Sequence, residues 1–214
     1  MDDIAGSYDA ISEQYADHYA DELAHKPIDR ALLGVVIEDA GTGAVVGDVG
    51  CGPGQIAAYL HEHGLRAVGI DLSPSMIELA RRRFPGPSFE IGSMLELPVH
   101  DGAWDAATAF YSSAQLAPRE RPLAFAELHR ALTPGAPLLV SFHVGDEVRH
   151  VDEMFEQRVS LDFHFLQTTE VAALMEQTGF TVEMSLQRAA YPAVETVTTR
   201  GYVLGRRLEA SAST

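Results

Sequence analysis

The sequence of 214 residues has little cysteine, little positive charge and no long apolar run. Its one cysteine, Cys51, excludes an internal disulfide and a zinc site built from several cysteines. No apolar run approaches the roughly 18 residues that span a membrane. The acidic start Met1-Asp2-Asp3 lacks the positive charge and apolar segment of a signal peptide. We therefore expect a cytoplasmic protein with no membrane partner.

Positive charge is scarce, because 15 Lys and Arg residues stand against 31 Asp and Glu residues, for a formal net charge of −16. Affinity for nucleic acid depends largely on neutralising phosphates. The densest basic run, Arg81-Arg82-Arg83, falls at the expected end of a helix, where cations interact favourably with the helix dipole. We therefore expect no nucleic-acid partner.

Apolar strand-like segments alternate with helix-like segments, and the length is typical of a single domain, residues 1–214. This alternation predicts an α/β fold, in which helices cover both faces of a mostly parallel sheet. The last two strands are expected to form an antiparallel pair. Segment 144–167 fits no clear element, so we expect a loop that caps the substrate side. Residues 210–214 are expected to be a disordered tail. The seven predicted strands are 44–49, 66–70, 88–91, 104–110, 136–142, 180–186 and 196–204.

A glycine-rich turn follows the first predicted strand and is the most informative segment. Its glycines, Gly50, Gly52 and Gly54, do not match the dinucleotide fingerprint, whose third glycine would fall at Gln55. Pro53 removes a backbone N–H donor from the turn. The spacing therefore argues against a pyrophosphate-containing cofactor.

Two acids indicate what binds instead. Asp48, at the end of the first strand, would repel a diphosphate but suits an ammonium group. Asp71, at the end of the second strand, suits a ribose diol, because a carboxylate accepts hydrogen bonds from both hydroxyls. An ammonium group and a ribose without phosphate describe S-adenosylmethionine.

Five motifs stand in the order and spacing of a known family and cover roughly residues 40–145. The chain resembles the class I S-adenosylmethionine-dependent methyltransferases, and is most similar to their small single-domain subgroup that includes quinone-biosynthesis-like enzymes. The resemblance implies a Rossmann-like, doubly wound, seven-stranded sheet with an antiparallel last strand in three α/β/α layers. The motifs are D-V-G-C-G-P-G, G-I-D-L-S, G-S-M-L-E-L-P, W-D-A-A-T-A-F-Y and L-T-P-G-A-P-L-L-V.

The resemblance also implies which residues bind the cofactor, whose product is S-adenosylhomocysteine. Residues 1–27 are expected to form a helical lid, and Lys26 to approach the cofactor carboxylate. Leu72 and Met76 either pack on the adenine or belong to the core. Ser93 stands where many family members have an acid. The expected cofactor-binding residues are Tyr15, Lys26, Asp48, Gly50, Gly52, Gly54, Asp71, Leu72, Met76, Ser93, Met94 and Phe110.

Four residues are candidates for contact with the methyl acceptor: Tyr111, His143, His150 and His164. His143 follows the fifth strand and is the candidate catalytic residue, because histidine accepts a proton near neutral pH. A structural or surface role is also open for each histidine. Their irregular spacing does not favour a metal site. We expect a small soluble acceptor, methylated on oxygen, nitrogen or carbon, and a monomer or homodimer.

Three other functions stand beside methyl transfer to a small molecule. A nicotinamide-dependent oxidoreductase is disfavoured by the missing third glycine, by Asp48 and by Pro53. A binding module that keeps the cofactor site without catalysis remains open. Nucleic-acid methylation is disfavoured by the net charge and by the absence of an Asn/Asp-Pro-Pro-aromatic motif.

Overall fold

The computed structural model describes residues 2–208, so the predicted tail of residues 210–214 lies outside the described residues. A seven-stranded sheet forms its centre, and its strands are β1 (Val45–Val49), β2 (Arg66–Asp71), β3 (Ser88–Ile91), β4 (Ala106–Phe110), β5 (Pro137–His143), β8 (Phe180–Arg188) and β9 (Arg200–Arg207). Their order is β3-β2-β1-β4-β5-β9-β8. The first five strands of this order are parallel, and β9 is antiparallel to both neighbours. The predicted fold class is confirmed.

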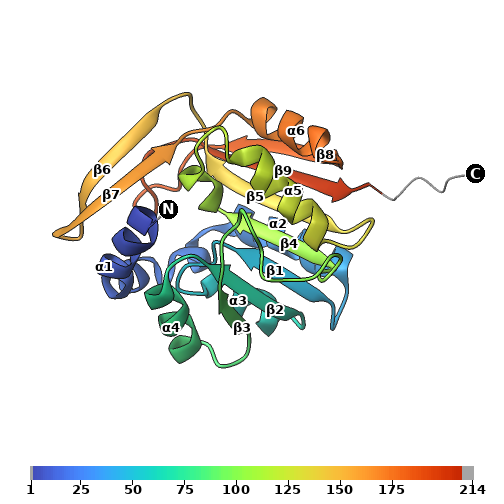
Figure 1. The fold of residues 1–214 in the computed structure, drawn as a ribbon, viewed down its shortest axis with the longest axis horizontal. Coiled ribbons are helices and arrows are strands. Elements are labelled where there is room, and N and C mark those ends of the chain that lie inside the picture. Colours follow the sequence, from blue (N-terminus) through green and yellow to red (C-terminus); the bar gives the residue numbers. More distant parts are fainter. Residues whose placement is uncertain (1, 209–214) are drawn as a thin grey trace, which may run out of the picture.

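Helices cover both faces of the sheet (Figure 1). One face packs against α2 (Pro27–Ala40), α3 (Gln55–Glu62) and α4 (Pro74–Arg83), and the other against α5 (Arg121–Ala131) and α6 (Thr168–Gln177). Strand β5 is buried at every position except His143. Such strands are almost entirely apolar because neither face meets water.

The start of α4 follows from its local sequence. Ser73 is the N-cap, and its hydroxyl accepts a hydrogen bond from the Met76 amide at 3.1 Å. Pro74 occupies the first helical position, where its missing N–H costs nothing. Because β2 ends two residues earlier, this start fixes Asp71 at the carboxyl edge of the sheet.

Segment 144–167 is a correction to the sequence prediction, because it contains a β-hairpin rather than a loop without structure. Its strands are β6 (Val148–Met154) and β7 (Gln157–His164), which pair antiparallel with a bulge between Val151 and Glu153. The turn residues Phe155 and Glu156 have φ of 53° and 62°. Hairpin turns of this kind usually carry Gly or Asn, so the sequence has no turn signal here. The bulge also interrupts the alternation that would reveal β6.

The N-terminal helix α1 (Asp2–Tyr19) lies beside the hairpin at one end of the sheet (Figure 1). Buried Ile11 packs with Val159 and Leu161 of β7 in a small apolar cluster apart from the main core. The Ser160 amide donates a hydrogen bond to Ser7 Oγ at 2.9 Å. A 3₁₀ helix, η1 (Glu22–His25), then leads into α2. The segment predicted as a helical lid, residues 1–27, therefore contains α1 and η1 as two separate helices.

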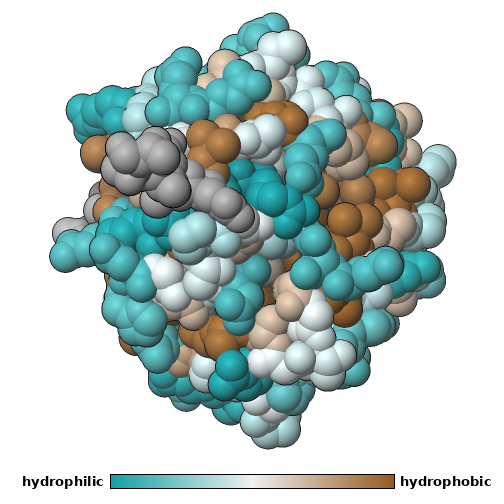
Figure 2. Space-filling view, turned by 90° about the vertical axis from the view of Figure 1, so that its right-hand side faces the viewer, coloured by the Kyte–Doolittle hydropathy of each residue, from teal (hydrophilic) through white to brown (hydrophobic). Residues whose placement is uncertain are grey.

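The surface opposite α1 mixes hydrophilic and hydrophobic residues, and the hydrophobic ones form several separate groups (Figure 2). Scattered exposed apolar residues are normal for a folded protein. Within residues 2–208, no helix has the length and apolar character needed to cross a membrane.

Candidate functional site

Two adjoining cavities open at the carboxyl ends of the parallel strands, where ligands bind in open α/β sheets. The first encloses about 910 Å³ and the second about 600 Å³, including space open to solvent. The cavities share five lining residues: Tyr15, Gly50, Gly52, Phe110 and Tyr111. One elongated molecule can therefore occupy both cavities across this shared wall.

The glycine turn forms part of that wall. Gly50 and Gly52 have φ of +71° and +51°, values that residues other than glycine rarely adopt. A Cβ on Gly52 would meet no atom within 4 Å, because the residue faces open cavity. A Cβ on Gly50 would lie 2.2 Å from Ser112 Cβ. Gly54, the residue before α3, lines neither cavity, and a Cβ on it would lie 2.8 Å from the Phe89 ring, so its predicted contact with the cofactor stays a prediction.

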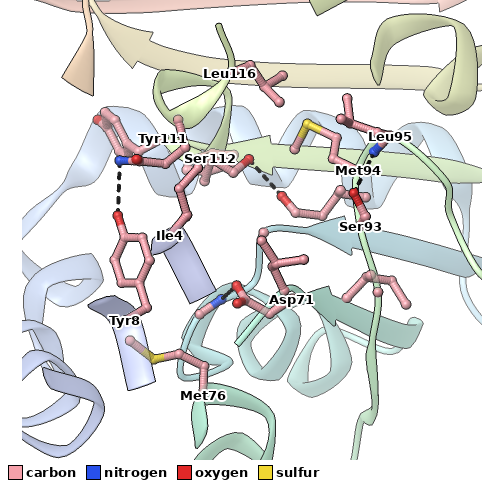
Figure 3. A pocket seen from close by; sticks show the side chains of 18 of the residues that line it. Ile4, Tyr8, Asp71, Met76, Ser93, Met94, Leu95, Tyr111, Ser112 and Leu116 are labelled. Atoms are coloured by element: carbon pink, nitrogen blue, oxygen red, sulfur yellow. Dashed lines mark hydrogen bonds between the residues drawn. The ribbon is translucent and has the colours of Figure 1, made fainter. Parts of the chain in front are cut away.

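Asp71 lines the first cavity, in the position that the prediction of a ribose-binding acid requires. Its Oδ2 accepts a hydrogen bond from the Gly52 amide at 2.8 Å (Figure 3), and its Oδ1 accepts one from the Ser73 amide at 2.9 Å. Burial raises the pKa of Asp71 above its usual value, and these two hydrogen bonds offset part of that rise. The carboxylate therefore fastens the glycine turn to the end of β2 and keeps lone pairs for a ligand.

Asp48 lies on the wall of the second cavity and is 1% exposed. The Thr108 hydroxyl donates to its Oδ1 at 2.9 Å, and the Ala57 amide in the first turn of α3 donates to its Oδ2 at 3.1 Å. Burial raises the pKa of Asp48 to about 7, although these hydrogen bonds act in the opposite direction. A cation bound beside Asp48 would favour its ionised form.

The four residues expected around the adenine all line the first cavity. Figure 3 labels three of them, Met76, Ser93 and Met94, around the same hollow as Asp71; Leu72 is the fourth. Ser93 Oγ accepts a hydrogen bond from the Leu95 amide at 3.1 Å, which shapes the loop after β3. Met76 is 1% exposed, so it belongs to the core as well as to the cavity wall.

Helix α1 closes the first cavity from the side opposite the strand ends. Ile4, Tyr8 and Tyr15 line it, and Tyr15 also reaches the second cavity. The Tyr15 ring lies 5.9 Å from the Tyr8 ring and 6.5 Å from that of Phe155 at the hairpin tip, both edge-on. The predicted lid helix and the hairpin therefore meet above the site.

Lys26 lines the second cavity, but it is already paired with carboxylates. Its Nζ lies 2.6 Å from Glu22 Oε1 and 3.1 Å from Glu195 Oε1, and 5.0 Å from the centre of the Tyr111 ring. Glu195 also pairs with Arg188, and despite burial these contacts lower the pKa of Glu195 to about 2. The predicted contact between Lys26 and the cofactor carboxylate stays a prediction, and it requires Lys26 to share its charge with two acids.

His143 lines neither of the two cavities and lies behind Tyr111. Its ring stacks on Phe165, and its Nδ1 lies 2.7 Å from the Thr198 hydroxyl. Burial, together with the nearby charges of Arg200 and Lys26, lowers the pKa of His143 to about 3. A ring of such low basicity, set behind Tyr111, is poorly placed to take a proton from a ligand.

The other two predicted histidines lie on the hairpin, and neither lines these cavities. His150 Nδ1 lies 2.7 Å from Asp162 Oδ1 across the two strands, with both side chains more than half exposed. His164 ends β7 opposite Val148. Among residues 2–208, no group of three or more His, Cys, Asp or Glu side chains is placed to hold a metal ion.

Several cavity residues were not found from the sequence. Gln115, in the 3₁₀ helix η2 (Ser112–Gln115), lines the first cavity, and Asp29 of α2 lines the second. Asp29 is 1% exposed, and its Oδ1 has no hydrogen-bond partner among the described residues. Neither residue belongs to a motif, so only their contacts across the fold reveal them.

The central part of the chain matches a known protein family. Residues 46–135 match the family model described as a methyltransferase domain, and this span contains the glycine turn, Asp71, Ser93 and Tyr111. The chain has the fold of class I S-adenosylmethionine-dependent methyltransferases. This match and the relatives described below support a class I S-adenosylmethionine-dependent methyltransferase of the quinone-biosynthesis-like kind, whose cofactor is S-adenosylmethionine.

Individual relatives extend the match beyond the motifs. The chain is 28% identical over 196 residues to the malonyl-[acyl-carrier protein] O-methyltransferase of Serratia marcescens, covering 90% of this chain and 71% of that one. It is 28% identical over 141 residues to the demethylmenaquinone methyltransferase of Beutenbergia cavernae, covering 65% of this chain and 57% of the relative.

A solved structure shows the same fold over nearly the whole chain. It is the 1,6-didemethyltoxoflavin-N1-methyltransferase of Burkholderia thailandensis, with 1,6-didemethyltoxoflavin and S-adenosylhomocysteine bound. The TM-score is 0.74 at 22% identity, over 96% of this chain and 87% of the Burkholderia chain. At this identity the likeness concerns the fold.

Proposed function

We propose that this protein transfers the methyl group of S-adenosylmethionine to a small soluble molecule bound beneath α1 and the β6–β7 hairpin. The observation that carries the proposal is the pair of adjoining cavities that share Gly50, Gly52 and Tyr111. The first offers the wall for an adenosine, and the second offers acids for an ammonium group. The Burkholderia enzyme, whose substrate is a small molecule, supports an acceptor of this size.

The residues present fit the two ends of the cofactor. In the first cavity, Asp71 accepts ribose hydroxyls, while Leu72 and Met94 offer apolar surface to the adenine. In the second, Asp48 is held by the Thr108 hydroxyl and the Ala57 amide. Asp29 pairs with Arg188 through its Oδ2 at 2.7 Å, and its Oδ1 has no hydrogen-bond partner among the described residues. A group carrying an ammonium would relieve the cost of these buried acids.

When bound, S-adenosylmethionine supplies a sulfonium methyl that is already activated for in-line displacement. The chain then has two tasks, to align the acceptor with that methyl and to exclude water. Alignment alone can contribute about 7–11 kcal/mol to lowering the barrier. Tyr111 and Phe110, which line both cavities, are placed to position the reacting groups. A general base would add only roughly 10²–10⁴-fold, so we assign the site no obligatory base.

Calorimetry with S-adenosylhomocysteine tests the cofactor half of this proposal. Wild type is expected to bind it, and Asp71→Ala to bind it at least about tenfold more weakly, because the ribose loses its acceptor. Binding of NADH, followed by its fluorescence, is the control for the oxidoreductase alternative. Tight binding of NADH without binding of S-adenosylhomocysteine would overturn the proposal.

Turnover separates an enzyme from a binding module. S-adenosylmethionine is mixed with the protein and a fractionated metabolite extract, and S-adenosylhomocysteine is measured. The proposal expects product in some fractions, and it expects the product to depend on an intact Asp71. Cofactor binding without turnover in any fraction would favour the non-catalytic module.

A further inference from the structure

The wall of the first cavity carries a hydrogen-bonding pair that the cofactor motifs do not use. The Gln115 side-chain amide donates from Nε2 to Tyr8 Oη at 3.2 Å. The two residues are 107 positions apart, on η2 and α1, and both line the cavity. Figure 3 shows the Tyr8 hydroxyl directed across the hollow toward the side of Tyr111 and Ser112.

This pair leaves one acceptor and one donor unused. Gln115 Oε1 is buried and has no hydrogen-bond partner among residues 2–208. The Tyr8 hydroxyl accepts from Gln115, so its own proton is available to a ligand. Burial raises the pKa of Tyr8, so the hydroxyl stays protonated at neutral pH and remains a donor. A buried acceptor without a partner costs about 1–3 kcal/mol, and a ligand donor would remove that cost.

The same cavity offers no positive charge. Its described lining contains neither Lys, Arg nor His, and its two carboxylates belong to Asp71 and Glu120. The cation of the neighbouring cavity, Lys26, lies between Glu22 and Glu195. A carboxylate or phosphate brought into this space would be buried without a partner, which is strongly unfavourable.

We propose that Tyr8 and Gln115 together bind a hydroxyl group of an uncharged methyl acceptor, the hydroxyl donating to Gln115 Oε1 and accepting from Tyr8 Oη. One hydroxyl satisfies both unused groups, because it carries a donor and acceptor lone pairs on the same atom. This inference rests on the proposed function and specifies its acceptor. The inferred acceptor differs from the malonyl group in the name of the Serratia relative, because a malonyl group carries a carboxylate.

Matched probes test the inference directly. Phenol and 2-naphthol are titrated by calorimetry into protein saturated with S-adenosylhomocysteine, and benzoate and 2-naphthoate serve as the anionic counterparts. Each pair keeps the ring and exchanges a hydroxyl for a carboxylate. We expect at least one hydroxyl probe to bind, and its anionic counterpart to bind at least about tenfold more weakly.

Variants assign the preference to the two residues. Tyr8→Phe and Gln115→Met each keep the size of the side chain and are expected to weaken the hydroxyl probe about 5- to 30-fold. The affinity for S-adenosylhomocysteine is expected to stay within about twofold of wild type, since neither side chain is assigned to the cofactor. Tyr19→Phe is the matched control, because Tyr19 lies on the same helix and lines neither cavity.

Three results would overturn the inference. The carboxylate probes could bind as tightly as the hydroxyl probes or more tightly, neither hydroxyl probe could bind, or Tyr8→Phe and Gln115→Met could lose affinity for S-adenosylhomocysteine. The last result would assign Tyr8 and Gln115 to the cofactor. Failure of wild type to bind S-adenosylhomocysteine would instead remove the proposed function itself. The two failures are therefore distinguishable in one set of titrations.

Discussion

The Asp9 carboxylate accepts a hydrogen bond from Ser73 Oγ at 2.5 Å and a second from the Ser75 amide at 3.0 Å, so α1 is fastened to the first turn of α4. Ser73 also donates its amide to Asp71, the acid of the first cavity. The position of the helix that covers the site is thus linked, through one serine, to the residue expected to hold the ribose.

Asp9→Ala should loosen this helix. The change removes an acceptor at the start of α4, which typically costs about 1 kcal/mol, and it frees α1 from the edge of the site. We expect faster hydrogen exchange in α1 and about fivefold weaker binding of S-adenosylhomocysteine. Glu13→Ala is the control, because it removes only an exposed ion pair with Arg82, a contact of small value. Equal effects of both changes would contradict this account.

Alanine at Gly50 and at Gly52 should have different consequences. Both substitutions place a side chain at positive φ, at a cost of about 1–2 kcal/mol. At Gly50 the new methyl would also collide with Ser112, so the free energy of unfolding in urea should fall by about 3 kcal/mol or more. At Gly52 the methyl has room in the protein but takes space from the ligand. Gly52→Ala should therefore fold and lose affinity for S-adenosylhomocysteine, and unchanged affinity would disprove the assignment.

Cofactor affinity should depend on pH through Asp48, whose pKa is raised to about 7 by burial. An ammonium group favours the ionised acid, so binding releases a proton, and affinity is lost as pH falls through about 7. Below that value the loss should approach about tenfold per pH unit. Calorimetry with S-adenosylhomocysteine between about pH 6 and 8 measures this dependence, and Asp48→Asn should flatten it.

The same raised pKa has the opposite consequence for the protein without ligand. Asp48 contributes to the free energy of unfolding because its pKa is higher in the folded protein than in the unfolded chain. This contribution is fully present below the unfolded-state pKa and is lost as pH rises through about 7. Asp48→Asn should therefore gain thermal stability relative to wild type at pH 8 but not at pH 5. Asp71, whose pKa is also raised, is common to both proteins, so the difference between them isolates Asp48.

Removing the imidazole of His143 should change turnover little. His143→Phe keeps a ring between Tyr111 and Phe165 and removes only the nitrogens. Loss of a true general base typically lowers the rate roughly 10²–10⁴-fold. We expect less than about a tenfold change in S-adenosylhomocysteine formation with an active extract fraction. A rate of S-adenosylhomocysteine formation lowered a hundredfold or more, with unchanged affinity for S-adenosylhomocysteine, would restore His143 as the catalytic residue.

The sequence predicted the sheet because its signals are local. The apolar strands and the glycine-rich turn each depend on a few neighbouring residues, and each is confirmed. The hairpin of residues 148–164 escaped prediction because its turn uses Phe155 and Glu156 at positive φ instead of glycine. In the folded protein the Phe155 ring contacts that of Tyr15, a contact between distant parts of the chain that local sequence signals do not reveal.

By itself, the sequence determined the family resemblance and the cofactor, since the glycine spacing and the strand-end acids are local and ordered. Only the tertiary structure decided three further features. It raised the pKa of Asp48 through burial, placed His143 behind Tyr111, and brought Tyr8 to Gln115 across 107 positions. The physical reason is that burial, and partners remote in sequence, arise only when the layers pack together.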